Sequence, residues 1–168
     1  MSSPLLSFSG AAIYVDAMVL AAYLRPESPW YSASVRFIQR AVDPARPITL
    51  VTAALTVDEV IFVLLQEMLL DPPFTVTRSR SQYLSGHPQI VRQLMAAIDG
   101  PLQTVLDVIA IEPVLPADIG AMRQEMLASG TLPRDAIHVA VMRRLGLSAV
   151  ATDDEGFERC AGITVYKP

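Results

Sequence analysis

The sequence predicts an α/β fold, a three-layer α/β/α sandwich in which a mainly parallel sheet lies between two layers of helices. Short apolar runs without charge alternate with amphipathic helical segments, and this order requires crossover connections and parallel strand pairing. The 168 residues fit one domain, and their 52% apolar content is enough for a core between two helical layers. We therefore expect residues 11–168 to form a single domain behind a loose N-terminal leader, residues 1–10.

The first half of the chain predicts two strand and helix units. Buried strands are indicated where apolar residues run together without charge, and helices where apolar residues recur three or four positions apart. Pro26–Pro29 ends the first helix, and Thr52 or Thr56 can serve as the N-cap of the last one. In order, we expect a strand over 11–15, a helix from about 17, a helix over 30–42, a strand over 48–51 and a helix that continues to about residue 70.

The second half begins with a polar stretch from residue 71 to about residue 86, for which the sequence gives no clear element. Prolines that open helices and glycines that follow them mark the boundaries of the later segments. A turn at Asp99, Gly100 and Pro101 is expected to separate two helices. In order, we expect helices over 88–98 and 101–108, a strand over 109–112, helices over 116–129 and 133–145, and strands over 147–152 and 163–166.

Composition narrows the classes of function. The formal net charge of −4 argues against a broad, non-specific grip on nucleic acid, although it leaves room for a local basic groove. Cys160 is the only cysteine, which excludes an internal disulfide and favours the reducing cytoplasm. The chain has no apolar run long enough for a membrane span and no signal-peptide pattern, so no membrane association is expected. GxSxG, GxGxxG and P-loop motifs are absent, which argues against serine hydrolase, dinucleotide and nucleotide-phosphate sites.

Acidic residues gather where the predicted strands end. Asp16 follows the first strand, and Asp153 and Asp154 follow the strand over 147–152. In open α/β sheets ligands bind outside the carboxyl ends of strands, at the point where the strand order reverses. Glu59 and Asp135 each lie early in a helix that begins at the same edge. These acids converge if the first strand and the strand over 147–152 are neighbours.

A pocket that contains four carboxylates needs a cation. Two carboxylates about 4 Å apart repel by roughly 4 kcal/mol at an effective dielectric near 20. Oxygen ligands select hard ions, so Mg²⁺ or Mn²⁺ is the expected occupant. The sequence has no cluster of cysteine and histidine that would suit zinc.

Each acid also has a purely structural explanation. Asp135 in a first helical turn interacts favourably with the helix dipole. Glu59 fits a capping box that begins at Thr56, and Asp154 can start a turn or cap a short helix. His138 lies one turn from Asp135 on the same helix, but a lone histidine there is read as a packed or surface residue and is left out of the site.

The four acids and their surroundings resemble the PIN-domain ribonucleases, especially the toxins of VapBC-type toxin and antitoxin pairs. The resemblance covers nearly the whole chain. It rests on IYVDAMVL around Asp16, LTVDEV around Glu59, LPRDAIHVAVMRRLG around Asp135 and ATDDEGF around Asp154.

The resemblance implies an endoribonuclease that depends on Mg²⁺ or Mn²⁺ and cleaves RNA as the toxin of such a pair. It also implies an antitoxin protein as partner and a homodimer. Catalysis and metal binding would fall to Asp16, Glu59, Asp135 and Asp154, with Thr152 supporting the acids through its hydroxyl and Asp153 as an additional acid.

Two features depart from the family. The family commonly has a small hydroxyl residue and then Asn or Ser after its first acid, where this chain has Ala17 and Met18, and the region 71–108 is longer than in compact members. Ala17, Met18 and the acidic overall charge motivate the alternative, a catalytically weak or inactive PIN-like subunit that binds RNA or protein. A phospho-acceptor receiver domain and a haloacid-dehalogenase-type phosphatase fit less well, because neither the acidic pair of the first nor the D-x-D signature of the second is present.

Overall fold

The structure, a computed structural model, describes residues 2–168. Its centre is a six-stranded, all-parallel sheet with the strand order β1-β6-β5-β2-β3-β4, which confirms the predicted fold class. The strands are β1 (Ser3–Pro4), β2 (Ala12–Val15), β3 (Thr49–Ala53), β4 (Ala110–Glu112), β5 (Ala149–Ala151) and β6 (Thr164–Lys167). The α-helices are α1 (Ala17–Tyr23), α2 (Tyr31–Ala41), α3 (Ala54–Met68), α4 (Arg80–Gly86), α5 (Pro88–Leu106), α6 (Pro116–Ser129) and α7 (Pro133–Arg144), and the 3-10 helices are η1 (Leu5–Ser7) and η2 (Glu155–Arg159).

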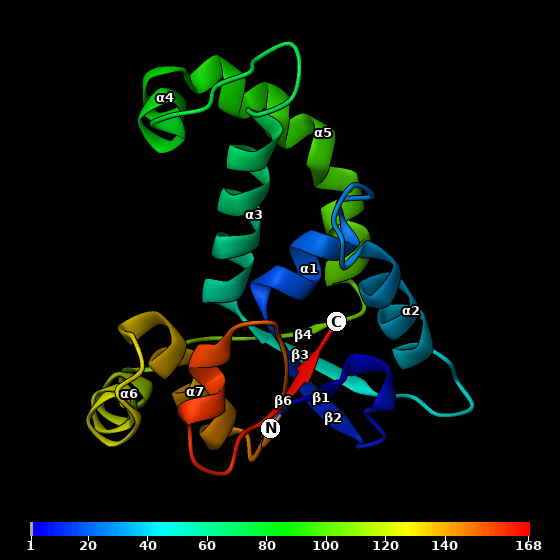
Figure 1. The fold of residues 1–168 in the computed structure, drawn as a ribbon, viewed down its shortest axis with the longest axis vertical. Coiled ribbons are helices and arrows are strands. Elements are labelled where there is room, and N and C mark those ends of the chain that lie inside the picture. Colours follow the sequence, from blue (N-terminus) through cyan, green and yellow to red (C-terminus); the bar gives the residue numbers. More distant parts are fainter. Residues whose placement is uncertain (1) are drawn as a thin grey trace.

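The sheet separates two apolar layers (Figure 1). Successive side chains of a strand point to opposite faces, so Ile13 and Val15 of β2 pack with α1, α2, α3 and α5, whereas Tyr14 packs with α7. Tyr14 and Ile13 are both fully buried. The central strand is thus covered on both faces, which explains why its sequence is a continuous apolar run rather than an alternating one.

The strand order reverses at β2, and this reversal positions the acids. β2 pairs with β5 on one side and with β3 on the other, so the carboxyl ends of β2 and β5 lie next to each other. Val15 is in register with Ala151, and the amide of Asp16 donates to the carbonyl of Ala151 at 3.1 Å. The predicted neighbourhood of the first strand and the strand over 147–152 is confirmed.

The expectation of a loose leader over residues 1–10 is wrong for the part that the structure describes. β1 pairs with the last strand, β6, and Leu5 and Phe8 are buried. The ring of Phe8 packs edge-on against Tyr166 with the ring centres 5.0 Å apart. These apolar side chains fix the segment to the sheet. Met1 belongs to the same expected leader and lies outside the described residues.

The expected turn at Pro101 is absent, because α5 continues through it as one helix. Proline removes the hydrogen bond to the carbonyl four residues earlier, which here belongs to the exposed Ala97. That carbonyl can bond to water, so the loss is small compared with the apolar face that the continuous helix buries. The buried residues of this face are Leu94, Ile98, Leu102 and Val105.

The segment between the strands β3 and β4 forms a helical extension. Figure 1 shows α3 and α5 running away from the sheet, with α4 at their far end. α4 lies in the polar stretch from residue 71 to about residue 86, where no element was predicted, and its Leu84 is buried against the extension. Within residues 2–168, no helix combines the length and the hydropathy that crossing a bilayer requires.

Candidate active site

Asp16 is a buried carboxylate at the end of the central strand. It is the N-cap of α1, and its Oδ1 accepts a hydrogen bond from the amide of Ala17 at 2.8 Å. Its Oδ2 accepts from the hydroxyl of Thr152 at 2.7 Å. Burial raises the pKa of Asp16 above its ordinary value, and the bond from Thr152 offsets part of that rise. Although residue 17 has no hydroxyl, Asp16 thus receives a hydroxyl hydrogen bond from Thr152, the residue after β5.

Thr152 connects Asp16 to Asp154. Its Oγ1 donates to Asp16 and also accepts from the amide of Asp154 at 3.0 Å. The Oδ1 of Asp154 in turn accepts a hydrogen bond from the amide of Gly156 at 2.7 Å. Asp154 therefore caps η2, which agrees with the structural role that the sequence analysis considered for it. This bond occupies one carboxylate oxygen and leaves the other without a protein hydrogen bond among residues 2–168. Capping and a role in the site are thus compatible.

Asp135 lies against the same η2 segment. It is in the first turn of α7, and a Cβ atom on Gly156 would meet its Oδ2 at 2.8 Å and the Oδ1 of Asp154 at 3.0 Å. Burial and then the negative charges of Asp154 and Asp16 raise the pKa of Asp135. The three aspartates therefore share one electrostatic environment. Gly156 was not among the predicted site residues, and the only available signal was its position at the end of the acidic run Asp153, Asp154 and Glu155.

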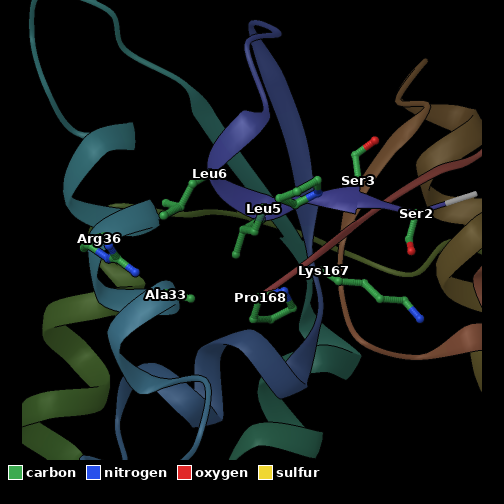
Figure 2. Close-up of a pocket in the computed structure, with 9 residues that line it drawn as sticks. Ser2, Ser3, Leu5, Leu6, Ala33, Arg36, Lys167 and Pro168 are labelled. Atoms are coloured by element: carbon green, nitrogen blue, oxygen red, sulfur yellow. The ribbon is translucent and has the colours of Figure 1, made fainter.

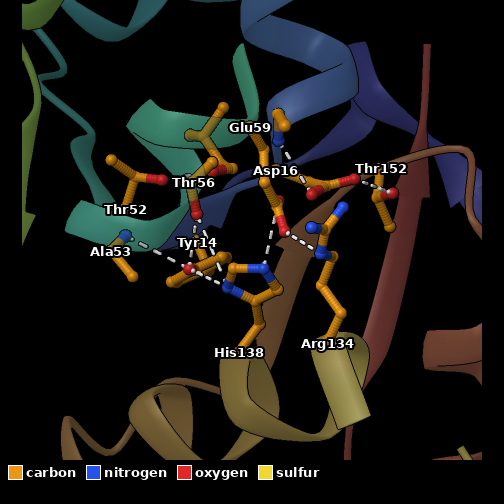
Figure 3. Close-up of polar contacts among 11 residues, drawn as sticks. Tyr14, Asp16, Thr52, Ala53, Thr56, Glu59, Arg134, His138 and Thr152 are labelled. Carbon is orange, nitrogen blue, oxygen red and sulfur yellow. Dashed lines mark hydrogen bonds and ion pairs between the residues drawn. The ribbon is translucent and has the colours of Figure 1, made fainter. Parts of the chain in front are cut away.

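Glu59 is buried beside this cluster, but two basic side chains accompany it (Figure 3). Its Oε2 lies 3.2 Å from Nε2 of His138, and its Oε1 lies 2.9 Å from Nε of Arg134. The Nε–H of Arg134 is not aligned for a hydrogen bond, so Oε1 is a buried oxygen compensated by charge alone. His138, which the sequence reasoning left out, contacts the candidate site directly.

Tyr14 is a further polar residue near the candidate site, and the sequence analysis had treated it as part of the apolar first strand. Its hydroxyl lies 2.8 Å from Nδ1 of His138 and 2.9 Å from Oγ1 of Thr56, residues 124 and 42 positions away in the chain. The proposed capping box at Thr56 does not form, because α3 begins after Ala53 and Thr56 turns toward Tyr14. Thr52 does not cap the helix either, and instead donates to the carbonyl of Val15 at 2.8 Å.

The donor chemistry of the cluster suits a hard divalent cation. The three aspartates present only oxygen atoms, and the negative charges of Asp154 and Asp16 add to the effect of burial in raising the pKa of Asp135. Across residues 2–168, no three Asp, Glu, His or Cys side chains are arranged so that they could hold a metal ion as they stand. Asp135 and Asp154, at the partly exposed edge, are the side chains that would have to close around an ion. The residues therefore fit a hard divalent ion by the chemistry of their donor atoms.

A separate pocket of about 430 Å³ lies between the N-terminal segment, α2 and the end of β6 (Figure 2). Residues 2–6, Ala33, Arg36, Lys167 and Pro168 line it. None of the four predicted acids belongs to this lining. The pocket is therefore distinct from the acidic cluster.

Comparison with known proteins agrees with this architecture. The family model for the PIN domain matches residues 13–163. The chain belongs to the PIN domain family. The matched region contains all four predicted acids, Asp16, Glu59, Asp135 and Asp154. No curated protein sequence matches the chain.

Solved structures share the fold at low sequence identity. The toxin VapC20 of Mycobacterium tuberculosis is 15% identical with a TM-score of 0.52, and the match covers 86% of this chain and 92% of that one. PAE2754 of Pyrobaculum aerophilum is 18% identical with a TM-score of 0.57, covering 94% and 92%. VapBC2 of Rickettsia felis, bound to a DNA fragment from its promoter, is 9% identical with a TM-score of 0.55, covering 94% and 98%. At these identities the similarity establishes the PIN fold.

Repulsion between the carboxylates of the acidic cluster should lower the free energy of unfolding of the PIN domain when no metal ion is bound. In Asp135→Asn the favourable interaction with the dipole of α7 is lost, about 0.3–1 kcal/mol, but repulsion from Asp154 and Asp16 disappears. The raised pKa of Asp135 indicates that repulsion and burial outweigh favourable interactions. We expect the free energy of unfolding in chelator at pH 7 to rise by about 0.5 kcal/mol, a value reduced for the partial exposure of the side chain.

Urea unfolding with a chelator measures this difference. Because the pKa of Asp135 is higher in the folded than in the unfolded chain, its contribution is present at low pH and is lost as the pH rises through the folded value. The advantage of Asp135→Asn should therefore grow as the pH rises above the ordinary aspartate value of 3.8. Asp99→Asn, at an exposed position of α5, serves as the control. A variant that is less stable than this control at neutral pH would contradict the prediction.

Proposed function

We propose that this PIN domain is an endoribonuclease that requires Mg²⁺ or Mn²⁺ and cleaves phosphodiester bonds of RNA. The observation that carries the proposal is the shared environment of Asp16, Asp135 and Asp154 at the carboxyl ends of β2 and β5. Placing three carboxylates from separate parts of the chain close together costs electrostatic free energy, because like charges repel. Such an arrangement is typical of a site whose function uses the negative charge. Membership of the PIN family supports the same function.

The roles follow from the contacts of each residue. Asp16, Asp135 and Asp154 would hold the cation, and Glu59 would act in the same site from the side of α3. A bound divalent ion lowers the pKa of water for attack on phosphorus and stabilises charge on the leaving oxygen. Thr152 keeps Asp16 and Asp154 at a fixed spacing through its two hydrogen bonds, 2.7 and 3.0 Å. The buried Oδ2 of Asp16 therefore keeps one orientation.

We also propose that the protein is the toxin of a toxin and antitoxin pair and forms a homodimer. Support for the toxin assignment comes from the fold that the chain shares with VapC20, a toxin that cleaves the sarcin-ricin loop, and with VapBC2. A small, separately encoded protein that copurifies and inhibits the nuclease would support this assignment, whereas a nuclease that purifies alone and is unaffected by its genomic neighbour would contradict it.

Metal dependence provides the direct test of the nuclease. Purified protein is incubated with a labelled RNA oligonucleotide in a chelator and again with excess Mn²⁺ or Mg²⁺. We expect cleavage to be at least about tenfold faster with the ion, as expected when a metal activates the attacking water. RNA binding without cleavage under every ion condition would indicate the alternative, a PIN-like binding subunit. Cleavage that continues unchanged in chelator would contradict the proposed mechanism.

A further inference from the structure

Among the arginines of α7, Arg134 differs from Arg143 and Arg144 in what its guanidinium contacts. Arg143 is bound to Glu125 at 2.8 Å and to a carbonyl, and Arg144 is bound to Asp118 at 3.0 Å and to a carbonyl. Those two arginines therefore join α7 to α6. The side chain of Arg134 is 66% exposed, and its ion pair with Glu59 is shortest at Nε, 2.9 Å from Oε1. Within residues 2–168, neither Nη of Arg134 donates a hydrogen bond.

Buried residues fix the partner of Arg134. A carboxylate only accepts hydrogen bonds, so Nε2 of His138 must carry the proton that faces Glu59. With a neutral ring, Nδ1 then accepts, and the donor is the hydroxyl of Tyr14 at 2.8 Å. The Tyr14 oxygen itself accepts from the amide of Ala53 at 3.1 Å and from Thr56 at 2.9 Å. The hydrogen bonds thus run in one direction, from Thr56 through Tyr14 and His138 to Glu59.

This chain of hydrogen bonds is well protected. Tyr14 and Thr56 are fully buried, and His138 is 2% exposed. Burial raises the pKa of Tyr14, so its hydroxyl keeps the proton that it donates to His138. A buried network in which each member has a defined partner is rigid, because any rotation would leave a polar atom unsatisfied. Glu59 therefore presents its second oxygen to Arg134 from a fixed position (Figure 3).

We propose that Arg134 binds a phosphate of the nucleic acid beside the acidic cluster, and that Glu59, Tyr14 and His138 are the residues that position it. Arg134 directly precedes Asp135, and its ion pair with Glu59 holds the guanidinium beside the cluster with no hydrogen bond from either Nη to residues 2–168. Guanidinium groups bind two phosphate oxygens at once, which suits these free donors. Carboxylates alone repel a phosphate, and a fixed cation beside them provides a point of attachment that does not depend on a metal. The inference rests on the proposed function, because it assumes an RNA substrate.

Binding without cleavage tests the role of Arg134. The anisotropy of a fluorescent single-stranded RNA is titrated in chelator at several salt concentrations. For Arg134→Ala we expect about tenfold weaker binding, as for the loss of one charge-assisted contact. The slope of log affinity against log salt should also become shallower by about 0.7, the value for one contact to a single strand. Arg123→Ala removes the same charge from an exposed site on α6 and should change both quantities much less.

The tautomer of the His138 ring tests the role of Tyr14 and His138 as positioning residues. Nitrogen NMR of the His138 ring should show the tautomer with the proton on Nε2 in the wild type. Tyr14→Phe removes the donor to Nδ1, whereas Glu59 still holds the proton on Nε2. We therefore expect the tautomer to be kept, the Nδ1 resonance to shift because its hydrogen bond is lost, and RNA binding in chelator to weaken about threefold. An Nδ1–H tautomer in the wild type would overturn the assigned chain of hydrogen bonds.

The outcomes separate this inference from the proposed function. If Arg134→Ala and Arg123→Ala weaken binding equally while the wild type cleaves RNA with Mn²⁺, the role of Arg134 is wrong and the nuclease remains. If the wild type binds no RNA in chelator, the attachment independent of metal is also wrong. If the wild type cleaves no RNA with any divalent ion but Arg134→Ala alone loses binding, the nuclease fails and the phosphate contact remains.

Discussion

Asp16→Asn is expected to abolish RNA cleavage by this PIN domain while leaving its fold intact. Asparagine keeps the size of the side chain, and its amide oxygen can still accept from Ala17 or Thr152, the two partners of Asp16. The substitution removes a full negative charge from the most buried acid of the cluster. We expect the cleavage rate with Mn²⁺ to fall by about a thousandfold, equivalent to about 4 kcal/mol of transition-state stabilisation.

Single-turnover cleavage of a labelled RNA measures the rate, and thermal unfolding in chelator measures the fold. Asp16→Asn should unfold at or above the wild-type temperature, because burial disfavours the charge that it removes. Asp99→Asn, which removes a charge from an exposed position of α5, should cleave at the wild-type rate. If Asp16→Asn protein cleaves as fast as the wild type, either a contaminating nuclease is responsible or the reaction occurs elsewhere on the protein.

The backbone of the candidate site could be predicted because it depends on local patterns. Apolar runs that stop at Asp16 and at Asp153 place carboxylates at strand ends without knowledge of the tertiary structure. The pairing of β2 with β5 then brings the two ends together, as the parallel arrangement requires. The same local rules failed at Pro101, where the apolar face of α5 outweighed the proline.

The residues that organise the side chains could not be predicted, because their partners are distant in sequence. Tyr14 looks like any apolar strand residue until His138 and Thr56 are placed beside its hydroxyl. His138 looks like a packed helix residue until Glu59 is found within 3.2 Å of its ring. A periodicity argument assigns a side chain to a face of the sheet, but it cannot identify which group from another element will meet it there.

The contacts of Gly156 with Asp135 could not be predicted from the sequence either. Substitution of Gly156 is expected to have the second large effect on metal binding and cleavage. In Gly156→Leu the Cβ atom alone would come within 2.8 Å of Oδ2 of Asp135 and 3.0 Å of Oδ1 of Asp154. Such distances are far below a normal contact, so the two carboxylates must move apart. We expect the affinity for Mn²⁺ and the cleavage rate each to fall by about a hundredfold, the upper range for residues that orient metal ligands. Gly156→Ala should act in the same direction with a smaller effect.

Stability distinguishes this displacement from general disruption of the fold. The atoms that the new side chain meets are the ends of flexible carboxylates, and Gly156 is not among the glycines with positive φ, so no backbone strain is added. The melting temperature in chelator should therefore change little, while calorimetry records the loss of Mn²⁺ binding. Gly120→Leu on α6, where a Cβ meets no atom within 4 Å, is the matched control. It should retain both the wild-type melting temperature and the wild-type affinity for Mn²⁺. Unaltered Mn²⁺ affinity in Gly156→Leu would show that Asp135 and Asp154 do not hold the ion together, and the proposed site would have to be abandoned.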